Sequence, residues 1–564
     1  MLRSRILRPW GRSFAHRTVR ISRPYNGTTT GPHTTYFQPP PQPSASPRRI
    51  WRSILLGSTC VGIGAYAHSW LYDLPFLGIG DGEEMIDGDM QRVEADILGA
   101  ALAEASRCLS ARNTPVMDLD MCEMVLQPAS GYAVTATAIS HFTQLASNLP
   151  CEDTFSSGAY TYEKDPAKAW CEWGLFDGHA GSRTAELLSQ ILAGAVGEKL
   201  WDEGCFDRPY KPNDTFIIDA LKTVFKKVDD DIVKHAMELV RSGQPDRATI
   251  VANIAMALSG SCALLALYDP VRHVLRVANT GDSRAVLGRW DGQKYIAHAM
   301  SVDQTGFNEQ EVERLKRDHP EEDVVDPKTG RVHGIAVSRA FGDARWKWPQ
   351  ELSKRAHELF WGPSPRPDRM IKTPPYLTAE PEVMETVVEV GERPDFLIMA
   401  TDGLWDNMSS DDAVACVQLW LDKNKPTTFL EQPQQSPEVI SQPNLQKPPG
   451  QPPPVWQQPK VFPPWLATSF TPSYSTPAEV SGEDEDVYYD KDERCLKWKV
   501  SPKHFINEDA HCGIHLVKNA LGGKRRDLFT GIMSVQPPLS RNVRDDITVH
   551  VVFFGFDGQQ AIKH

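Results

Sequence analysis

Four apolar stretches of this chain each have an aspartate at one end. They are residues 173–177, 275–282, 396–402 and 545–554, and the aspartates are Asp177, Asp282, Asp402 and Asp545. Each stretch has the length and apolar character of a buried strand. Carboxylates gathered at one place repel one another, and a hard divalent cation at their centre reverses that repulsion. The pattern therefore predicts strand ends that converge on a metal ion.

The charge of the chain is divided unevenly along its length. The whole chain of 564 residues carries a net charge of −13. Residues 1–72 contain ten arginines, no lysine and no acidic residue, so subtracting +10 from −13 leaves −23 on residues 73–564. An acidic body disfavours nucleic acid as the main partner. The length suits one large domain with extensions, or two domains.

The N-terminal region has the composition of a targeting segment. Residues 1–23 are rich in arginine, contain serine and lack acidic residues, as mitochondrial transit peptides do. Residues 24–47 are rich in Pro, Thr and Ser. We therefore interpret residues 1–47 as a mitochondrial presequence and a disordered segment.

A candidate membrane anchor follows at residues 48–72. The apolar run 53–72 is about as long as one membrane span needs, follows three arginines and ends near Trp70 and Tyr72. Alternatively, the run is the second half of a presequence that is later removed. An inner-membrane anchor would favour a body in the intermembrane space, because arginines tend to stay on the matrix side. Without the anchor, the body would lie in the matrix.

Apolar periodicity organises the remaining residues. We expect a polar connector at 73–130 with a helix at 94–106, a folded domain at 131–555 and a tail at 556–564. Within the domain the spacing predicts helices at 180–200, 214–240, 410–422 and 506–521, and strands at 261–268, 273–279, 283–289 and 547–554. A segment rich in Pro, Gln and Ser, from about 425 to 486, predicts a surface insertion. The ten cysteines form no C-x-x-C pair, which indicates thiols in a reducing compartment.

Seven short motifs resemble those of one enzyme family. They are Cys151-Glu-Asp153, Phe176-Asp-Gly-His-Ala-Gly181, Gly260-Ser-Cys-Ala263, Asn279-Thr-Gly-Asp-Ser-Arg284, Ala336-Val-Ser-Arg-Ala-Phe-Gly-Asp343, Thr401-Asp-Gly-Leu-Trp-Asp406 and Arg544-Asp-Asp-Ile-Thr548. Each motif alone is weak. Their order across residues 131–555 resembles that of the metal-dependent serine/threonine protein phosphatases of type 2C, the PPM family. The sequence has no G-x-S-x-G turn, so a serine nucleophile is poorly supported.

The resemblance implies an α+β fold, a four-layer α-β-β-α sandwich with two antiparallel sheets flanked by helices. It also implies a metal centre in which Asp177 bridges two ions and the Gly178 carbonyl binds one of them. The further ligands would be Asp402 and Asp545 for the other ion, Glu152 and Asp153 for metal-bound waters or a completed ligand set, and Asp282 and Asp406 for a third ion. Carboxylate and carbonyl oxygens suit Mg²⁺ or Mn²⁺ rather than zinc.

The resemblance further implies a reaction. A hydroxide that bridges two metal ions would attack the phosphorus of phosphoserine or phosphothreonine in line. His179, two residues after Asp177, would protonate the departing serine or threonine oxygen. We therefore regard Asp177 and His179 as the candidate catalytic residues.

Five further positions have open or supporting roles. Many relatives carry a phosphate-binding arginine where this chain has Asn148, and an asparagine can offer only a neutral hydrogen bond. Asp282 could be structural instead of a ligand, and Asp546 stands where the family usually has asparagine. We expect Arg339 and Asp343 to support the fold or the site instead of touching phosphate.

Finer details resemble the branch that contains the mitochondrial pyruvate dehydrogenase phosphatases. They lie at residues 148–153, 308–320, 341–348 and 519–523. This resemblance implies a phosphoprotein substrate, with the E1 α subunit of the pyruvate dehydrogenase complex as the leading choice. One alternative is a catalytically inactive phosphatase-like scaffold. Another is an active phosphatase that faces the intermembrane space and has a different substrate.

Overall fold

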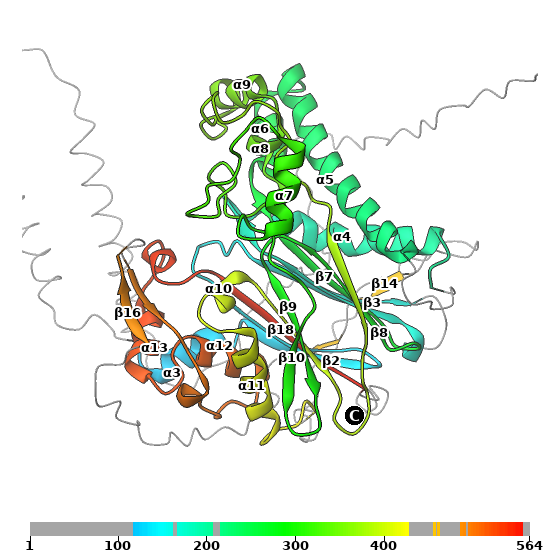
Figure 1. Cartoon of the computed structure of the whole chain (residues 1–564), viewed down its shortest axis with the longest axis vertical. Helices are drawn as coiled ribbons and strands as arrows, with labels where there is room; N and C mark the ends of the chain where they lie inside the picture. The colour runs from blue at the N-terminus through cyan, green and yellow to red at the C-terminus, as the bar shows by residue number, and fades with distance from the viewer. Residues whose placement is uncertain are drawn as a thin grey trace, which may run out of the picture. The chain divides into compact units, whose positions relative to one another are not determined.

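Two antiparallel sheets form the centre of the body (Figure 1). The structure is a computed structural model that describes residues 117–161, 166–206, 215–427, 455–457, 460–462, 486–491 and 495–555. The seven-stranded sheet has the order β10 (Tyr295–Ala299), β9 (Arg284–Trp290), β13 (Phe396–Ala400), β18 (Ile547–Phe554), β2 (Ala138–Leu145), β1 (Ser130–Val134) and β15 (Lys460–Phe462). The six-stranded sheet has the order β12 (Glu382–Val387), β8 (Val274–Thr280), β7 (Ala263–Asp269), β4 (Trp170–Phe176), β3 (Thr154–Thr161) and β14 (Val455–Gln457). Neighbouring strands in both sheets pair antiparallel.

The central strands are buried on both faces, which explains their continuous apolar runs. Every residue of β4, β7, β8, β13 and β18 is buried. Alternate side chains of a strand point to opposite faces. In β13, Leu397 and Met399 pack between the two sheets, whereas Phe396 and Ile398 pack toward the helices. The strands that precede or follow the four aspartates are therefore core strands, with side chains packed on both faces of their sheet.

Helices cover the outer face of each sheet. Helices α4 (Arg183–Asp202) and α5 (Phe216–Ser242) pack on the six-stranded sheet. Helices α3 (Leu119–Leu126), α11 (Ser410–Leu421), α12 (Cys512–Ala520) and α13 (Arg526–Ser534) share a core with the seven-stranded sheet. This helix–sheet–sheet–helix arrangement confirms the expected α+β four-layer sandwich.

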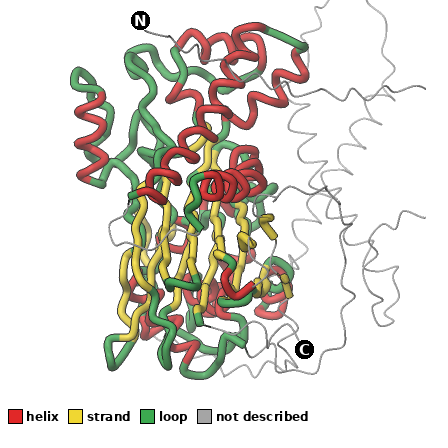
Figure 2. Tube along the Cα trace, turned by 90° about the vertical axis from the view of Figure 1, so that its right-hand side faces the viewer, coloured by secondary structure: helices red, strands yellow, loops and turns green. Residues whose placement is uncertain are grey.

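A cap of short helices lies beyond one end of the strands (Figures 1 and 2). It contains α6 (Arg247–Leu258), α7 (Glu309–Asp318), α8 (Ala344–Lys347) and α9 (Gln350–Phe360). Arg339 is buried in this region and pairs with Glu311 at 2.5 Å and with Glu382 at 3.0 Å. Arg339 therefore joins α7 to β12, which is a supporting contact within the fold.

The first described helix lies inside the segment that we expected to be a connector. Cys122 and Leu126 of α3 are fully buried in the core of the seven-stranded sheet. Lys518 on α12 pairs with Glu123 of α3 and, at 2.8 Å, with Asp509. The folded body therefore begins before residue 131, at least at α3.

The helix expected at 506–521 is shorter than its apolar spacing predicted. It begins at Cys512, and the Nδ1 atom of His511 accepts the Ile514 amide at its N-terminus. The Asn519 side chain accepts the amide of Ile506 at 2.8 Å and donates to its carbonyl at 3.1 Å. The carbonyl of Ile506 therefore meets the Asn519 side chain instead of the amide four residues later that a helix would supply.

Within the predicted insertion, the described residues include two short edge strands. Strand β14 adds to β3 and strand β15 adds to β1. The predicted presequence, the candidate anchor at 48–72 and the helix expected at 94–106 lie outside the described residues. In the part of the chain that is described, no helix combines the length and the apolar character that a membrane crossing requires.

Buried histidines make the stability of this fold depend on pH. Burial lowers the pKa of His511 and His515 to about 4 and that of His550 to about 3. An unfolded histidine has a pKa near 6.5. Stability from these neutral rings is thus complete above about pH 6.5 and is lost as pH falls toward 4, because only the unfolded chain takes up the protons. At pH 5 the loss is about 2 kcal/mol for each ring.

We expect His550→Leu to flatten the stability curve between pH 7 and pH 5 by about 2 kcal/mol. Urea unfolding at a series of pH values measures this change. His298→Leu, which removes an exposed histidine on β10, is the matched control and should leave the slope as in the parent chain. A His550→Leu curve parallel to that of the parent would contradict the account.

Candidate active site and metal centre

The four aspartate-bearing strand ends meet at one cavity. Asp177 follows β4 and Asp282 follows β8, both in the six-stranded sheet, whereas Asp402 follows β13 and Asp545 precedes β18 in the other sheet. All four line a cavity of about 1620 Å³, together with Asp406. The sandwich therefore brings together, from both of its sheets, the carboxylates that the sequence predicted to converge.

Two glycines allow the strand ends to approach this closely. Gly178 follows Asp177, and a Cβ atom there would overlap the backbone carbonyl oxygen of Glu152. Gly403 follows Asp402, and a Cβ atom there would overlap the backbone carbonyl oxygen of Asp546. Both Asp-Gly pairs therefore need glycine, because another segment of the site passes directly against the backbone.

The Glu152–Asp153 pair is held by defined hydrogen bonds. Glu152 accepts the Gly181 amide at 2.6 Å and the Asn148 side-chain amide at 3.0 Å. Buried Asp153 accepts the hydroxyls of Thr401 at 3.0 Å and Thr548 at 2.8 Å on one oxygen. These bonds connect the pair, which directly precedes β3 of the six-stranded sheet, to Thr401 after β13 and to Thr548 on β18 of the other sheet.

Asp546 has a structural place beside this pair. Its Oδ1 atom accepts the amide of Ser147 at 2.5 Å and its hydroxyl at 2.9 Å, and it also accepts the Asn148 amide at 3.2 Å. Its Oδ2 atom accepts the Glu152 amide at 2.8 Å. Both oxygens of Asp546 thus hold the loop 147–152, which explains an aspartate at this position without a ligand role.

The carboxylates at the floor of the cavity strongly disfavour one another's ionisation. Removal from water raises the pKa of Asp177 well above its usual range, and the charges of Asp402, Asp153 and Asp282 raise it further. Removal from water, followed by Asp282 and Asp406, likewise raises the pKa of Asp402. For Asp153, burial and then Asp546 raise the pKa to about 7.

The same residues fit a hard divalent cation. The Oδ2 atom of Asp177 is buried and has no hydrogen-bond partner within the described residues. A buried carboxylate oxygen without a donor is costly unless a cation meets it. The surrounding ligand atoms are mostly carboxylate oxygens, which favour Mg²⁺ or Mn²⁺. An ion here would relieve both the missing donor and the mutual repulsion.

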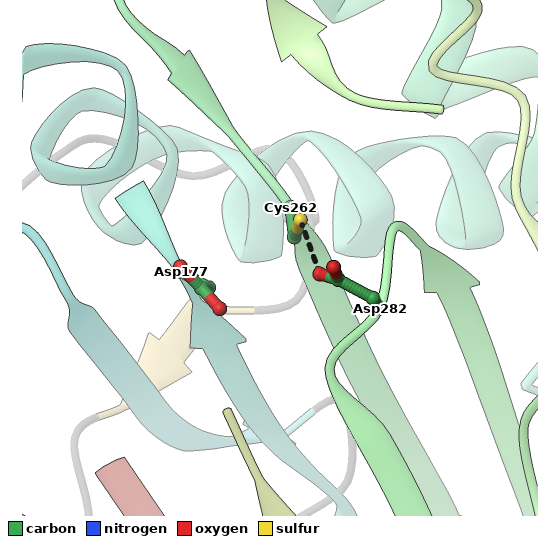
Figure 3. Close-up of side chains that lie close together, drawn as sticks. All are labelled: Asp177, Cys262 and Asp282. Atoms are coloured by element: carbon green, nitrogen blue, oxygen red, sulfur yellow. Dashed lines mark hydrogen bonds between the residues drawn. The ribbon is translucent and has the colours of Figure 1, made fainter. Parts of the chain in front are cut away.

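One neighbour of this cluster was not assigned from the sequence. Figure 3 shows Asp282 reaching toward Cys262, with Asp177 at the end of β4 nearby, and the Cys262 thiol donates to Asp282 at 3.2 Å. The ligand-type atoms of these three residues lie within 4.8 Å of one another. Burial and then the charge of Asp282 raise the pKa of Cys262 well above its usual range, so the thiol keeps its proton and orients Asp282. A lone cysteine carries no sequence signal for this contact.

His179 and Asp343 form a dyad at the cavity wall. A small sheet pairs β5 (Gly178–His179) with β6 (Gly260–Ser261), and β6 with β11 (Phe341–Gly342), after which Asp343 follows directly. The Nε2 atom of His179 lies 2.7 Å from Asp343, whose side chain is only 1% exposed. Burial alone would lower the pKa of His179, but the charge and hydrogen bond of Asp343 outweigh it and the net pKa is raised.

Gly260 makes this dyad sterically possible. A Cβ atom at Gly260 would overlap both the His179 ring and the Asp343 carboxylate. Asp343 has a positive φ of 52° and donates its amide to the Ser259 carbonyl at 3.0 Å. Asp343, which we expected to support the fold or the site, therefore holds the His179 ring in place.

Arg541 is the functional candidate that sequence reasoning missed. It lies on the short 3₁₀ turn η5 (Leu539–Asn542), forms an ion pair with Asp545 and lines the large cavity. It also lines a second cavity of about 750 Å³ with Asn148 and Glu152. The only sequence signal is its place four residues before Asp545, the spacing at which charged pairs form on a helix.

Comparisons with known proteins identify relatives of this chain. The family profile described as PP2C, protein phosphatase 2C, matches residues 146–443, just over half of the chain. The chain is similar to a protein phosphatase 2C homolog of Schizosaccharomyces pombe, with 35% identity over 73% of this chain and 79% of that protein. It is also similar to the mitochondrial pyruvate dehydrogenase (acetyl-transferring) phosphatase 1 of Saccharomyces cerevisiae, with 30% identity over 90% and 86%. The Bos taurus protein of that name is 39% identical over 37% of this chain and 39% of its own length.

We expect Asp177→Asn to stabilise the metal-free protein and to abolish its stabilisation by Mn²⁺. The neutral amide removes a repelled charge and an unmet acceptor, a gain of about 1–3 kcal/mol. Thermal unfolding with EDTA and with a Mn²⁺ series measures both effects. Asp318→Asn, which changes an exposed carboxylate at the end of α7, is the charge-matched control. A Mn²⁺ response retained in Asp177→Asn would exclude Asp177 as a metal ligand.

Proposed function

The chain belongs to the protein phosphatase 2C family and is a protein serine/threonine phosphatase, and from this premise we propose how its site works and where it acts. The proposed reaction is metal-dependent hydrolysis of phosphoserine and phosphothreonine esters on a mitochondrial protein. The single observation that carries it is the cavity in which strand-end carboxylates from both sheets surround Asp177 beside His179. Hydrolysis of a phosphate ester needs a cationic centre and a proton donor, and the carboxylates that would hold metal ions line the cavity together with His179.

The residues proposed to hold the ions are those already placed at the strand ends. Asp177 and the Gly178 carbonyl would bind one ion, with Asp177 bridging to a second ion. The remaining ligands would be Asp402 and Asp545 for the second ion, Glu152 and Asp153 through waters, and Asp282 with Asp406 for a third. When bound, Mg²⁺ or Mn²⁺ supplies an acidified water and neutralises the charge of the phosphate.

His179 is the proposed general acid. Asp343 occupies its Nε2 atom and favours the protonated ring, so Nδ1 is the nitrogen from which a proton can be given. As water attacks the phosphorus, the bond between phosphorus and the serine or threonine oxygen breaks, and that oxygen takes the proton from His179. Asp343 thus positions His179 without touching the substrate itself.

We expect His179→Gln to slow phosphoserine peptide hydrolysis about 10²–10⁴-fold, the usual contribution of a general acid. Hydrolysis of p-nitrophenyl phosphate should fall much less, because its leaving group departs without a proton. Both rates are measured with Mn²⁺, and EDTA should abolish them in the parent chain. Equal losses on the two substrates would contradict the role, and a parent chain that binds Mn²⁺ but never releases phosphate would favour the scaffold alternative.

The proposed substrate is a phosphoprotein of the pyruvate dehydrogenase complex, with the E1 α subunit foremost. The Saccharomyces cerevisiae relative is named as a mitochondrial phosphatase of pyruvate dehydrogenase, and the similarity to it extends over 90% of the chain. The arginine-rich, acid-free residues 1–23 support the same address. We propose a body in the matrix, where this substrate lies, and thus no anchoring role for residues 48–72.

Import of the full chain into isolated mitochondria tests this address. The body should stay protected from protease after the outer membrane is ruptured, and carbonate should release it. Deletion of residues 53–72 should leave both results unchanged. A body that protease degrades and carbonate leaves in the membrane would place the enzyme in the intermembrane space, with a different substrate.

A further inference from the structure

The cavity has an acidic floor, yet its substrate is an anion. A phosphate monoester carries close to two negative charges near neutral pH. Metal ions would meet the floor carboxylates, but the phosphate also needs donors on its outer oxygens. Guanidinium groups suit this role, because their fixed fork matches two oxygens of a phosphate at once.

We propose that Arg541 binds the phosphate group of the substrate, acting from the turn η5 beside Asp545. The inference rests on the proposed phosphatase function and adds a substrate-binding residue to it. Arg541 lines both cavities, so its guanidinium lies where the acidic floor meets the pocket that contains Asn148. Its side chain is 39% exposed, which leaves it accessible to an entering ester.

The turn that carries Arg541 is fixed to the loop that carries Asn148. The hydroxyl of Ser540 donates to the carbonyl of Ser147 at 2.5 Å. Arg544 donates to the carbonyl of Ala146 at 3.2 Å. Asp546 then accepts the amides of Ser147 and Asn148. These contacts join the two segments on both sides of Arg541, so a cation on one segment can serve a phosphate that lies against the other.

Asn148 itself cannot provide this charge. Its side-chain amide donates to Glu152 at 3.0 Å and is neutral. The other arginines that line the large cavity face different partners: Arg183 pairs with Glu186 at 3.1 Å, Arg331 donates to the Gly334 carbonyl at 3.4 Å, and Arg345 donates to the Ser364 carbonyl at 2.5 Å. By contrast, Arg541 pairs with Asp545, one of the strand-end carboxylates that line the cavity. Arg541 is therefore the arginine of the large cavity whose guanidinium lies at the carboxylate cluster.

The test compares Arg541→Ala and Arg541→Lys with the parent chain. KM for a phosphoserine peptide and the inhibition constant of inorganic phosphate should both rise about ten- to a hundredfold in Arg541→Ala. Arg541→Lys should show a smaller rise, because it keeps the charge but loses the fork. Adding Asn148→Arg to Arg541→Ala should recover at least part of the phosphate affinity. Arg317→Ala, which removes an exposed arginine of α7, is the charge-matched control and should keep the parent values.

Direct binding keeps this test separate from that of the proposed function. Calorimetric titration with inorganic phosphate in the presence of Mn²⁺ needs no turnover. It therefore measures the contribution of Arg541 to phosphate affinity even if the peptide is not hydrolysed. Parent turnover is the separate test of the phosphatase function. The Mn²⁺ midpoint of thermal stabilisation is measured in each folded variant, because Arg541 also contacts Asp545. Unchanged phosphate affinity in Arg541→Ala, or a loss explained wholly by a shifted Mn²⁺ midpoint, would overturn the inference.

Discussion

Carboxylates at four converging strand ends repel one another, and the sandwich core must hold them together against that repulsion. Asp177, Asp282, Asp402 and Asp545 come from four strands of two sheets and line one cavity. Such a cluster destabilises a protein unless a cation meets it. The fold accepts the arrangement because its strands are buried on both faces, so the sandwich core holds the ends in place against their repulsion.

Neutral and backbone donors absorb part of that repulsion. The hydroxyls of Thr401 and Thr548 meet Asp153, four donors meet Asp546, and the Cys262 thiol meets Asp282. Asp177 keeps a buried oxygen without a partner among the described residues. Hydrogen-bond donors thus meet Asp153, Asp282 and Asp546. Asp177, the residue proposed to bridge the ions, keeps an oxygen atom that a metal ion could bind. His179, the proposed proton donor, and Arg541, the proposed phosphate-binding residue, line the same cavity.

The fold was largely predictable, because a buried strand has a simple signature. The helices and strands expected at 180–200, 214–240, 273–279 and 547–554 agree with α4, α5, β8 and β18 to within a few residues. Contacts between distant residues were not predictable in the same way. The Asn519–Ile506 exchange shortened a helix, and the His179–Asp343 dyad depends on a three-strand register that no local pattern encodes. Arg541 was missed because its role comes from a turn packed against a loop almost four hundred residues away.

Anomalous scattering from crystals of the chain grown with Mn²⁺ would locate metal ions among these carboxylates. We expect manganese peaks bounded by the carboxylates of Asp177, Asp402 and Asp545, and none after soaking in EDTA. Carboxylates that hydrogen-bond one another as protonated acids, with no manganese between them, would contradict this expectation.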